Sequence, residues 1–79
     1  MKSGQAVLDR HAGPFTLMGW RRIKKDILQH AILAKAVPRD EVDDQAQMFL
    51  EDPRDTIDHI TIWSESEEQI AYTYRKEDL

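Results

Sequence analysis

Near the N-terminal end of the chain, hydrophobic residues recur every three or four positions. At about 100° per residue, Trp20, Ile23, Ile27 and Ala31 fall on one side of a helix, and the charged residues of the same stretch face away. This spacing is typical of an amphipathic α-helix. We therefore predict a long first helix over about residues 17–36, roughly 30 Å in length at about 1.5 Å per residue.

The boundaries of this helix follow from its flanking residues. Thr16 is a suitable N-cap, and Phe15 and Trp20 then occupy the two positions of a hydrophobic staple. The helix should end at Val37, because the residue before Pro38 is pushed out of the α region. Several basic residues lie near the helix start, where they oppose the helix dipole, so an acidic neighbour must favour them there.

A second helix is expected over residues 41–51. Asp40 is a good N-cap for it, with Asp43 at the capping-box position. Its apolar stripe consists of Val42, Ala46, Phe49 and Leu50. The helix stops at Asp52, before a proline, and the short connection to the first helix makes the two neighbours.

The C-terminal half contains two segments, residues 57–63 and 70–75, that are rich in β-branched and aromatic residues. They predict an antiparallel hairpin joined by a polar loop, with Ile60 and Ile62 on one face. Residues 1–14 fit a short strand less well than a short helix or an irregular arm, because only three apolar residues occur together.

These elements predict one α+β domain over residues 1–79, in which two consecutive helices pack on the C-terminal hairpin. The same order of elements occurs in the winged helix–turn–helix, where the second helix enters the major groove and the hairpin is the wing. The likeness is one of topology.

The composition narrows the class of protein. The 79 residues are 41% hydrophobic and 33% charged, which is typical of a globular domain. No cysteine is present, so a disulfide framework, a thiolate nucleophile and a cysteine zinc site are excluded. No apolar run is long enough for a membrane span or a signal peptide. We expect a soluble, cytoplasmic protein that does not contact membranes.

The net charge of −4 conceals a division of the chain into two halves. The first 39 residues carry a net charge of +6, and the last 40 carry −10. An acidic half of this size would attract and orient positively charged proteins. Such a split points to interaction with a charged partner.

Direct binding to DNA is the alternative that the basic half suggests. Phosphate contacts supply most of the affinity for DNA, so the surface that touches it must be basic. The predicted second helix and the hairpin loop are both acidic, and the DNA backbone would repel them. The candidate basic residues are Arg21, Arg22, Lys24 and Lys25.

No arrangement of residues indicates catalysis or metal binding. His30 lies one turn after Asp26, which is more typical of an ordinary pair on a helix surface than of half a catalytic relay. Asp58 and His59 are adjacent on a strand, so their side chains point to opposite faces. A small ribonuclease would need a basic groove, and the C-terminal half is acidic. We therefore expect no enzyme activity, no cofactor and no metal.

The sequence thus predicts a protein-binding module, namely an inhibitor or antitoxin-like module that covers the basic, nucleic-acid-binding surface of a target protein. Small acidic proteins encoded by phages, including the anti-CRISPR kind, are similar in size and charge. The predicted partner-binding residues are Asp40, Glu41, Asp43, Asp44, Glu51, Asp52, Asp55, Glu65, Glu67 and Glu68.

The basic residues 21–25 could form a second interface, for a homodimer or for an acidic patch on the partner. The alternative function is that of a winged-helix-like DNA-binding regulator, which would contact DNA through the basic first helix.

Overall fold

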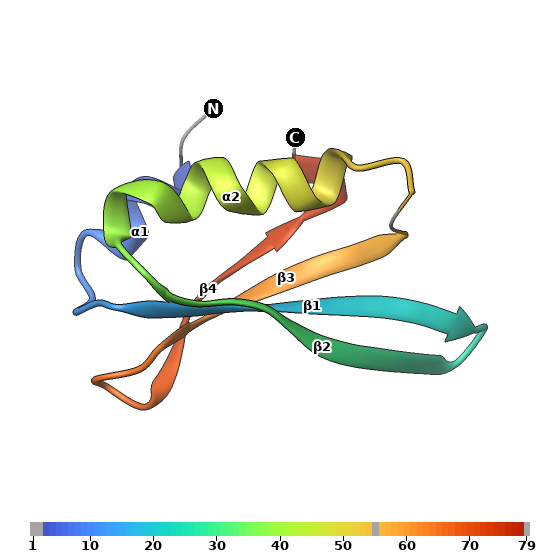
Figure 1. The fold of residues 1–79 in the computed structure, drawn as a ribbon, viewed down its shortest axis with the longest axis horizontal. Helices are drawn as coiled ribbons and strands as arrows, with labels where there is room; N and C mark the ends of the chain where they lie inside the picture. The colour runs from blue at the N-terminus through green and yellow to red at the C-terminus, as the bar shows by residue number, and fades with distance from the viewer. Residues whose placement is uncertain (1–2, 55, 79) are drawn as a thin grey trace.

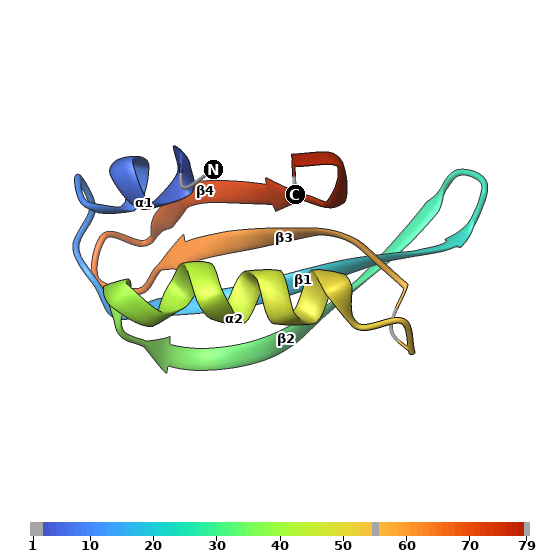
Figure 2. The same cartoon turned by 90° about the horizontal axis from the view of Figure 1, so that it is seen from above.

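The computed structural model describes residues 3–54 and 56–78 and shows a four-stranded antiparallel sheet with the strand order β2-β1-β3-β4. Both α-helices lie on one side of the sheet, and the other side, here named the open face, has no helix over it (Figures 1 and 2). The elements are α1 (Ser3–Leu8), β1 (Phe15–Lys24), β2 (Ile27–Val37), α2 (Arg39–Glu51), β3 (Ile57–Ser64), β4 (Gln69–Arg75) and the 3₁₀ helix η1 (Lys76–Asp78).

The long first helix predicted over residues 17–36 is wrong, and so is the fold of two helices packed on a hairpin. That stretch forms most of β1 and β2, which pair antiparallel with Lys24 opposite Ile27. Lys25 and Asp26 make the turn between them. The basic residues that would have opposed a helix dipole therefore lie at the end of a hairpin, where there is no helix dipole.

β1 lies between β2 and β3 in the sheet and carries apolar residues on both of its faces. Phe15 and Leu17 are completely buried under the helices, whereas Thr16 and Met18 line a hollow on the open face. Each face of the strand has its own alternation of every second residue. Where apolar residues of both faces are read together along the sequence, they recur every three or four positions, as they do in an amphipathic helix. Thr16 is therefore no helix N-cap, and Phe15 and Trp20 form no staple.

The core lies between the sheet and the helices. Leu8 of α1 and Val42, Ala46 and Leu50 of α2 pack with the inward residues of the strands, and all four are completely buried. The inward strand residues are Phe15, Leu17, Val37, Ile57, Ile60, Ile62, Ala71 and Tyr74. The predicted apolar stripe of the second helix is thus the surface that contacts the sheet, with Phe49 partly buried at its margin.

The predicted C-terminal hairpin is confirmed, since β3 and β4 pair antiparallel and Ile60 and Ile62 face the core. Ile57 also reaches the core, because an irregularity in the pairing of β3 with β1 changes the alternation at that point. Of the short helix and the irregular arm that the sequence left open for the N-terminal residues, the structure shows the helix, α1. α2 begins two residues earlier than predicted, with Pro38 rather than Asp40 at the N-cap position.

No helix among the described residues combines the length and the apolar character needed to cross a bilayer.

Candidate functional site

The start of α2 carries three outward carboxylates: Asp40, Glu41 and Asp44, here named the acidic helix start. They are exposed because Val42 and Ala46 occupy the inward side of the same turns. Asp40 and Glu41 lie in the first turn, where the helix dipole favours negative charge. Within the described ranges, neither of these two forms an ion pair, and Glu41 accepts only a long bond of 3.4 Å from Gln45.

Arg39, the first residue of α2, does not neutralise these acids. Its side chain turns away to donate hydrogen bonds to two backbone carbonyls, those of Leu8 at 3.1 Å and of His11. The guanidinium thus joins the end of α1 to the start of α2.

Asp43, a predicted partner-binding residue, lies inside the protein. Only 4% of it is exposed, and its Oδ1 accepts a 3.0 Å hydrogen bond from the hydroxyl of Tyr74 on β4. Gln47 donates to its other oxygen at 3.2 Å. Burial, together with the carboxylate beside it, raises the pKa of Tyr74 well above its usual value of 10, so the hydroxyl stays a donor. Asp43 joins α2 to the sheet.

Two acids of the β3–β4 turn hold other segments in place. Glu65 accepts hydrogen bonds from the hydroxyl of Thr16 at 2.7 Å and from the N–H of Ala36 at 2.9 Å, and these bonds lower its pKa. The backbone of Ala36 has a φ of 52°, and its N–H points to Glu65 in this conformation.

Glu67 is fixed in a similar way at the other side of the turn. His11 at 2.8 Å and the N–H of Ala12 at 2.6 Å bond to its carboxylate and lower its pKa to about 2, with a smaller contribution from Gln69. Glu68, next in the turn, is exposed.

The remaining predicted acids lie at the far end of α2. Glu51 is exposed on the last turn, and Asp52 accepts the N–H of Arg54 at 2.9 Å, which lowers the pKa of Asp52. Asp55 lies outside the described residues. Apart from the buried Asp43, the predicted acids among the described residues therefore occupy three places: the acidic helix start, the β3–β4 turn and the end of α2.

The predicted basic residues all lie on the far end of the β1–β2 hairpin, here named the arm (residues 21–30). The arm extends beyond the helices, at the end of the molecule opposite the β3–β4 turn (Figure 1). Arg22, Lys24 and Lys25 are exposed on it, and the Arg22 guanidinium donates to the carbonyl of Lys25 at 2.9 Å across the turn. Arg22 also lies 3.9 Å from Asp58 in a loose ion pair.

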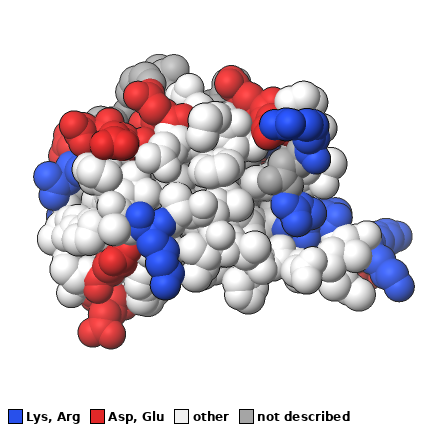
Figure 3. Space-filling view, in the orientation of Figure 1, with Lys and Arg blue, Asp and Glu red and all other residues white. Residues whose placement is uncertain are grey.

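The charges of the two halves of the sequence are partly separated in space. Lys and Arg gather at the arm, and Asp and Glu gather over the start of α2 and at the β3–β4 turn, but basic side chains also lie beside both of these acidic groups (Figure 3). Asp43 and Asp44 each have further interactions within the chain.

The open face carries a group of rings that the sequence analysis missed. The indole of Trp20 stacks on His59 with ring centroids 5.7 Å apart and contacts His30 at 4.9 Å. Its N–H donates to the hydroxyl of Thr61 at 2.9 Å, and His59 bonds to Asp58 at 2.9 Å. The prediction that the side chains of Asp58 and His59 point to opposite faces is therefore wrong, because the irregularity in the pairing of β3 with β1 falls at Asp58. The alternation of Thr16, Met18 and Trp20 was the signal that could have placed this group on one face of a strand.

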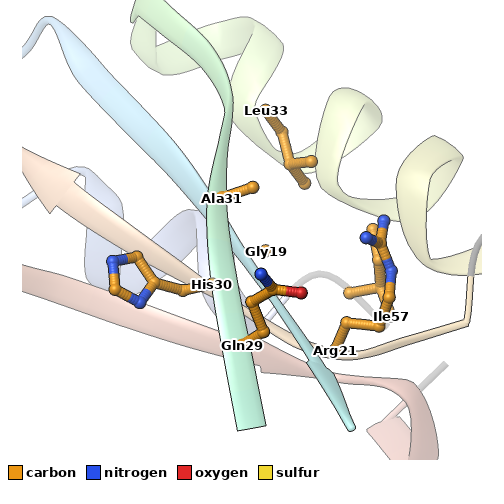
Figure 4. Close-up of a pocket in the computed structure, with 7 residues that line it drawn as sticks. All are labelled: Gly19, Arg21, Gln29, His30, Ala31, Leu33 and Ile57. Atoms are coloured by element: carbon orange, nitrogen blue, oxygen red, sulfur yellow. The ribbon is translucent and has the colours of Figure 1, made fainter. Parts of the chain in front are cut away.

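A cavity of about 140 Å³ lies beside the base of the arm. Leu33 points toward α2, and Arg21 lies beside Ile57, while His30 projects on the other side of β2 (Figure 4). Leu33 lies directly over Gly19, where an added Cβ would come within 2.8 Å of its Cδ1. The cavity is lined by residues of β1 and β2, together with Ile57 of β3.

No group of three or more histidine, aspartate or glutamate side chains within residues 3–54 and 56–78 is arranged to hold a metal ion. The imidazoles of His30 and His59 are both in contact with Trp20, and that of His11 bonds to Glu67. Each of these three imidazoles therefore has a structural contact within the chain.

Comparison with known proteins adds no relative: no protein-family model, no curated protein and no solved structure matches this chain.

Proposed function

We propose that this chain is a protein-binding module without chemistry of its own, and that it acts as an inhibitor. In this proposal the acidic helix start covers a basic, nucleic-acid-binding surface of a target protein in the cytoplasm, in the manner of small acidic phage proteins or antitoxins. The gathering of acidic side chains over the start of α2, away from the basic arm, supports it, because a cationic partner is attracted to such a surface (Figure 3).

The acidic helix start supports the proposal more strongly than the other acids do. Asp40 and Asp44 are one helical turn apart, so two like charges lie side by side on the exposed surface, an arrangement that weakens a helix. A cationic partner would relieve this repulsion. Asp43, Glu65, Glu67 and Asp52 are engaged in bonds within the chain, and Asp44 also has an interaction there, so the exposed charge of Asp40 and Glu41 is the main support for the proposal.

The experiment immobilises the full chain, passes a cell lysate over it and identifies the retained proteins by mass spectrometry. Nucleic-acid-binding proteins should be retained, and short duplex DNA should release them at constant ionic strength, since it competes for the same surface. The variant Glu41→Lys/Asp44→Lys should lose them. Asp26→Lys/Glu77→Lys is the matched control, because it changes the net charge equally at exposed sites outside the predicted partner-binding residues. Equal retention by both variants would refute the proposal.

The arm supports a second candidate, direct binding to nucleic acid. A two-stranded ribbon fits the major groove of DNA, and Arg22, Lys24 and Lys25 would contact phosphates there. A mobility shift with random duplex DNA at low salt separates the two candidates. Tight, salt-sensitive retardation that is lost in Lys24→Glu/Lys25→Glu would favour the arm and count against the inhibitor.

A further inference from the structure

The arm exposes large apolar side chains as well as charges. Ile23 and Ile27 are 53% and 50% exposed, and Leu28 next to them is also exposed. These residues lie on the last rungs of the hairpin, where Lys24 pairs with Ile27. Isolated apolar residues are common on protein surfaces, but a group of them on a projecting element usually marks a contact with another molecule.

A matching hollow lies on the open face at the other end of the sheet. Its volume is about 490 Å³, and Met18, Ile32 and Trp63 form its apolar floor. Glu65 and Glu68 stand at its margin, together with Lys35. The hydrogen bonds that Glu65 accepts lower its pKa, so its carboxylate keeps its charge.

The arm cannot reach the hollow of its own chain. Thr16 lines the hollow, and Lys24 ends the same strand; at about 3.3 Å per residue they are about 26 Å apart on a continuous β-strand. The arm is apolar and basic, and the hollow is apolar with two glutamates and one lysine in its lining, so the two are complementary in chemistry, but only between two molecules.

We propose that the chain forms a two-fold homodimer in which the arm of each copy lies in the open-face hollow of the other. Ile23 and Ile27 would cover the apolar floor, while Lys24 and Lys25 would face the margin with Glu65 and Glu68. A second copy is the occupant because both parts of the contact are present in every chain. A two-fold axis between two antiparallel copies satisfies both contacts at once and closes the assembly.

This inference is independent of the proposed function. The acidic helix start lies on the helix side of the sheet, away from the open face, so a dimer would present one such surface on each of its outer sides (Figure 2).

The mass of the full chain in solution, measured by sedimentation equilibrium over a concentration series, gives the first result. We expect the mass of two chains at tens of micromolar, and the mass of one chain for Ile27→Glu and for Ile32→Glu. Met48→Glu is the matched control, because Met48 is an equally exposed apolar residue on α2. It should remain a dimer. A wild-type monomer, a mass that grows without limit, or equal dissociation of the control would overturn the proposal.

Reciprocal charge reversal tests the pairing itself. Lys24→Glu/Lys25→Glu and Glu65→Lys/Glu68→Lys should each be monomeric alone, and circular dichroism should show both to be folded. Their mixture should form a heterodimer, because each arm then meets a rim of opposite charge. No association in the mixture would contradict the proposal.

Should the Glu65 variant lose its fold, Ile27→Cys mixed with Ile32→Cys provides the same information, because the chain has no cysteine of its own. An intermolecular disulfide between the two variants is expected. Its absence under oxidising conditions would overturn the pairing.

Discussion

Replacing Tyr74 with phenylalanine determines whether Asp43 belongs to the fold or to a partner-binding surface. The Tyr74 hydroxyl and the Asp43 carboxylate are 3.0 Å apart and almost fully buried, and they join β4 to α2. A hydrogen bond to a charged group contributes about 1.5–3 kcal/mol, and the carboxylate oxygen left behind would still be buried. We expect the free energy of unfolding to fall by about 2 kcal/mol, against a total of about 4–12 kcal/mol for a chain of this length.

In a domain of this size, a loss of about 2 kcal/mol lowers the melting temperature by about 8–16 °C. Urea unfolding of Tyr74→Phe, Asp43→Asn and the double variant yields the coupling energy between the two side chains. Tyr72→Phe is the matched control, because it removes a hydroxyl from the neighbouring ring, and it should change stability by no more than about 0.5 kcal/mol. A coupling energy near zero, or a Tyr74→Phe variant as stable as the control, would refute the structural role of Asp43.

Three further predictions concern the turn, the arm base and α1. The pKa of Glu67 is about 2 when folded and 4.5 when unfolded, so its contribution to stability is full above pH 4.5 and is lost as the pH falls toward 2. Acid titration of Glu67→Gln, followed by circular dichroism, should show a smaller loss than the wild type over that range. Gly19→Val places methyl groups against Leu33 and should cost about 1–3 kcal/mol in urea unfolding, whereas an unchanged midpoint would contradict the close approach. Leu8→Ala should cost about 2–5 kcal/mol if α1 is docked in the core as described, and less than about 1 kcal/mol if it is not.

The parts of the fold that the sequence predicted correctly have one unambiguous pattern each. α2 has a single apolar stripe and a proline at each end, and the β3–β4 hairpin has alternating isoleucines and a polar turn. In these elements, propensity, periodicity and flanking residues all favour the same structure.

The β1–β2 hairpin was missed because its pattern is ambiguous and its turn has no glycine or asparagine. Lys25 and Asp26 connect the strands, and an irregular pairing beside them adjusts the twist that a glycine turn usually provides. The basic residues 21–25 were evidence against the helix, because positive charge near a helix N-terminus opposes the helix dipole, whereas a projecting hairpin has no such dipole.

For the candidate site, the sequence predicted which residues are charged, but it did not predict which of them are bonded within the chain. The exposed positions of Asp40 and Glu41 follow from the helical pattern. The internal bonds of Asp43, Glu65 and Glu67 depend on β4, on Thr16 and on Ala12, which are distant in the sequence. Such long-range partners give no signal in the spacing of residues along the chain.

The separation of charge along the molecule follows from the connectivity of the strands. Phe15, at the start of β1, pairs with both Val37 and Ser64, so the start of α2 and the β3–β4 turn must lie at the same end of the sheet. The turn between β1 and β2 must then lie at the other end. The basic residues of the arm therefore lie at one end, and the acids of the α2 start and of the β3–β4 turn lie at the other, where Lys35 and Arg39 also lie. Glu51 and Asp52, by contrast, lie at the far end of α2. An antiparallel pair of copies is then the arrangement in which the arm of one copy meets the acidic turn of the other, and added salt should weaken such a pair.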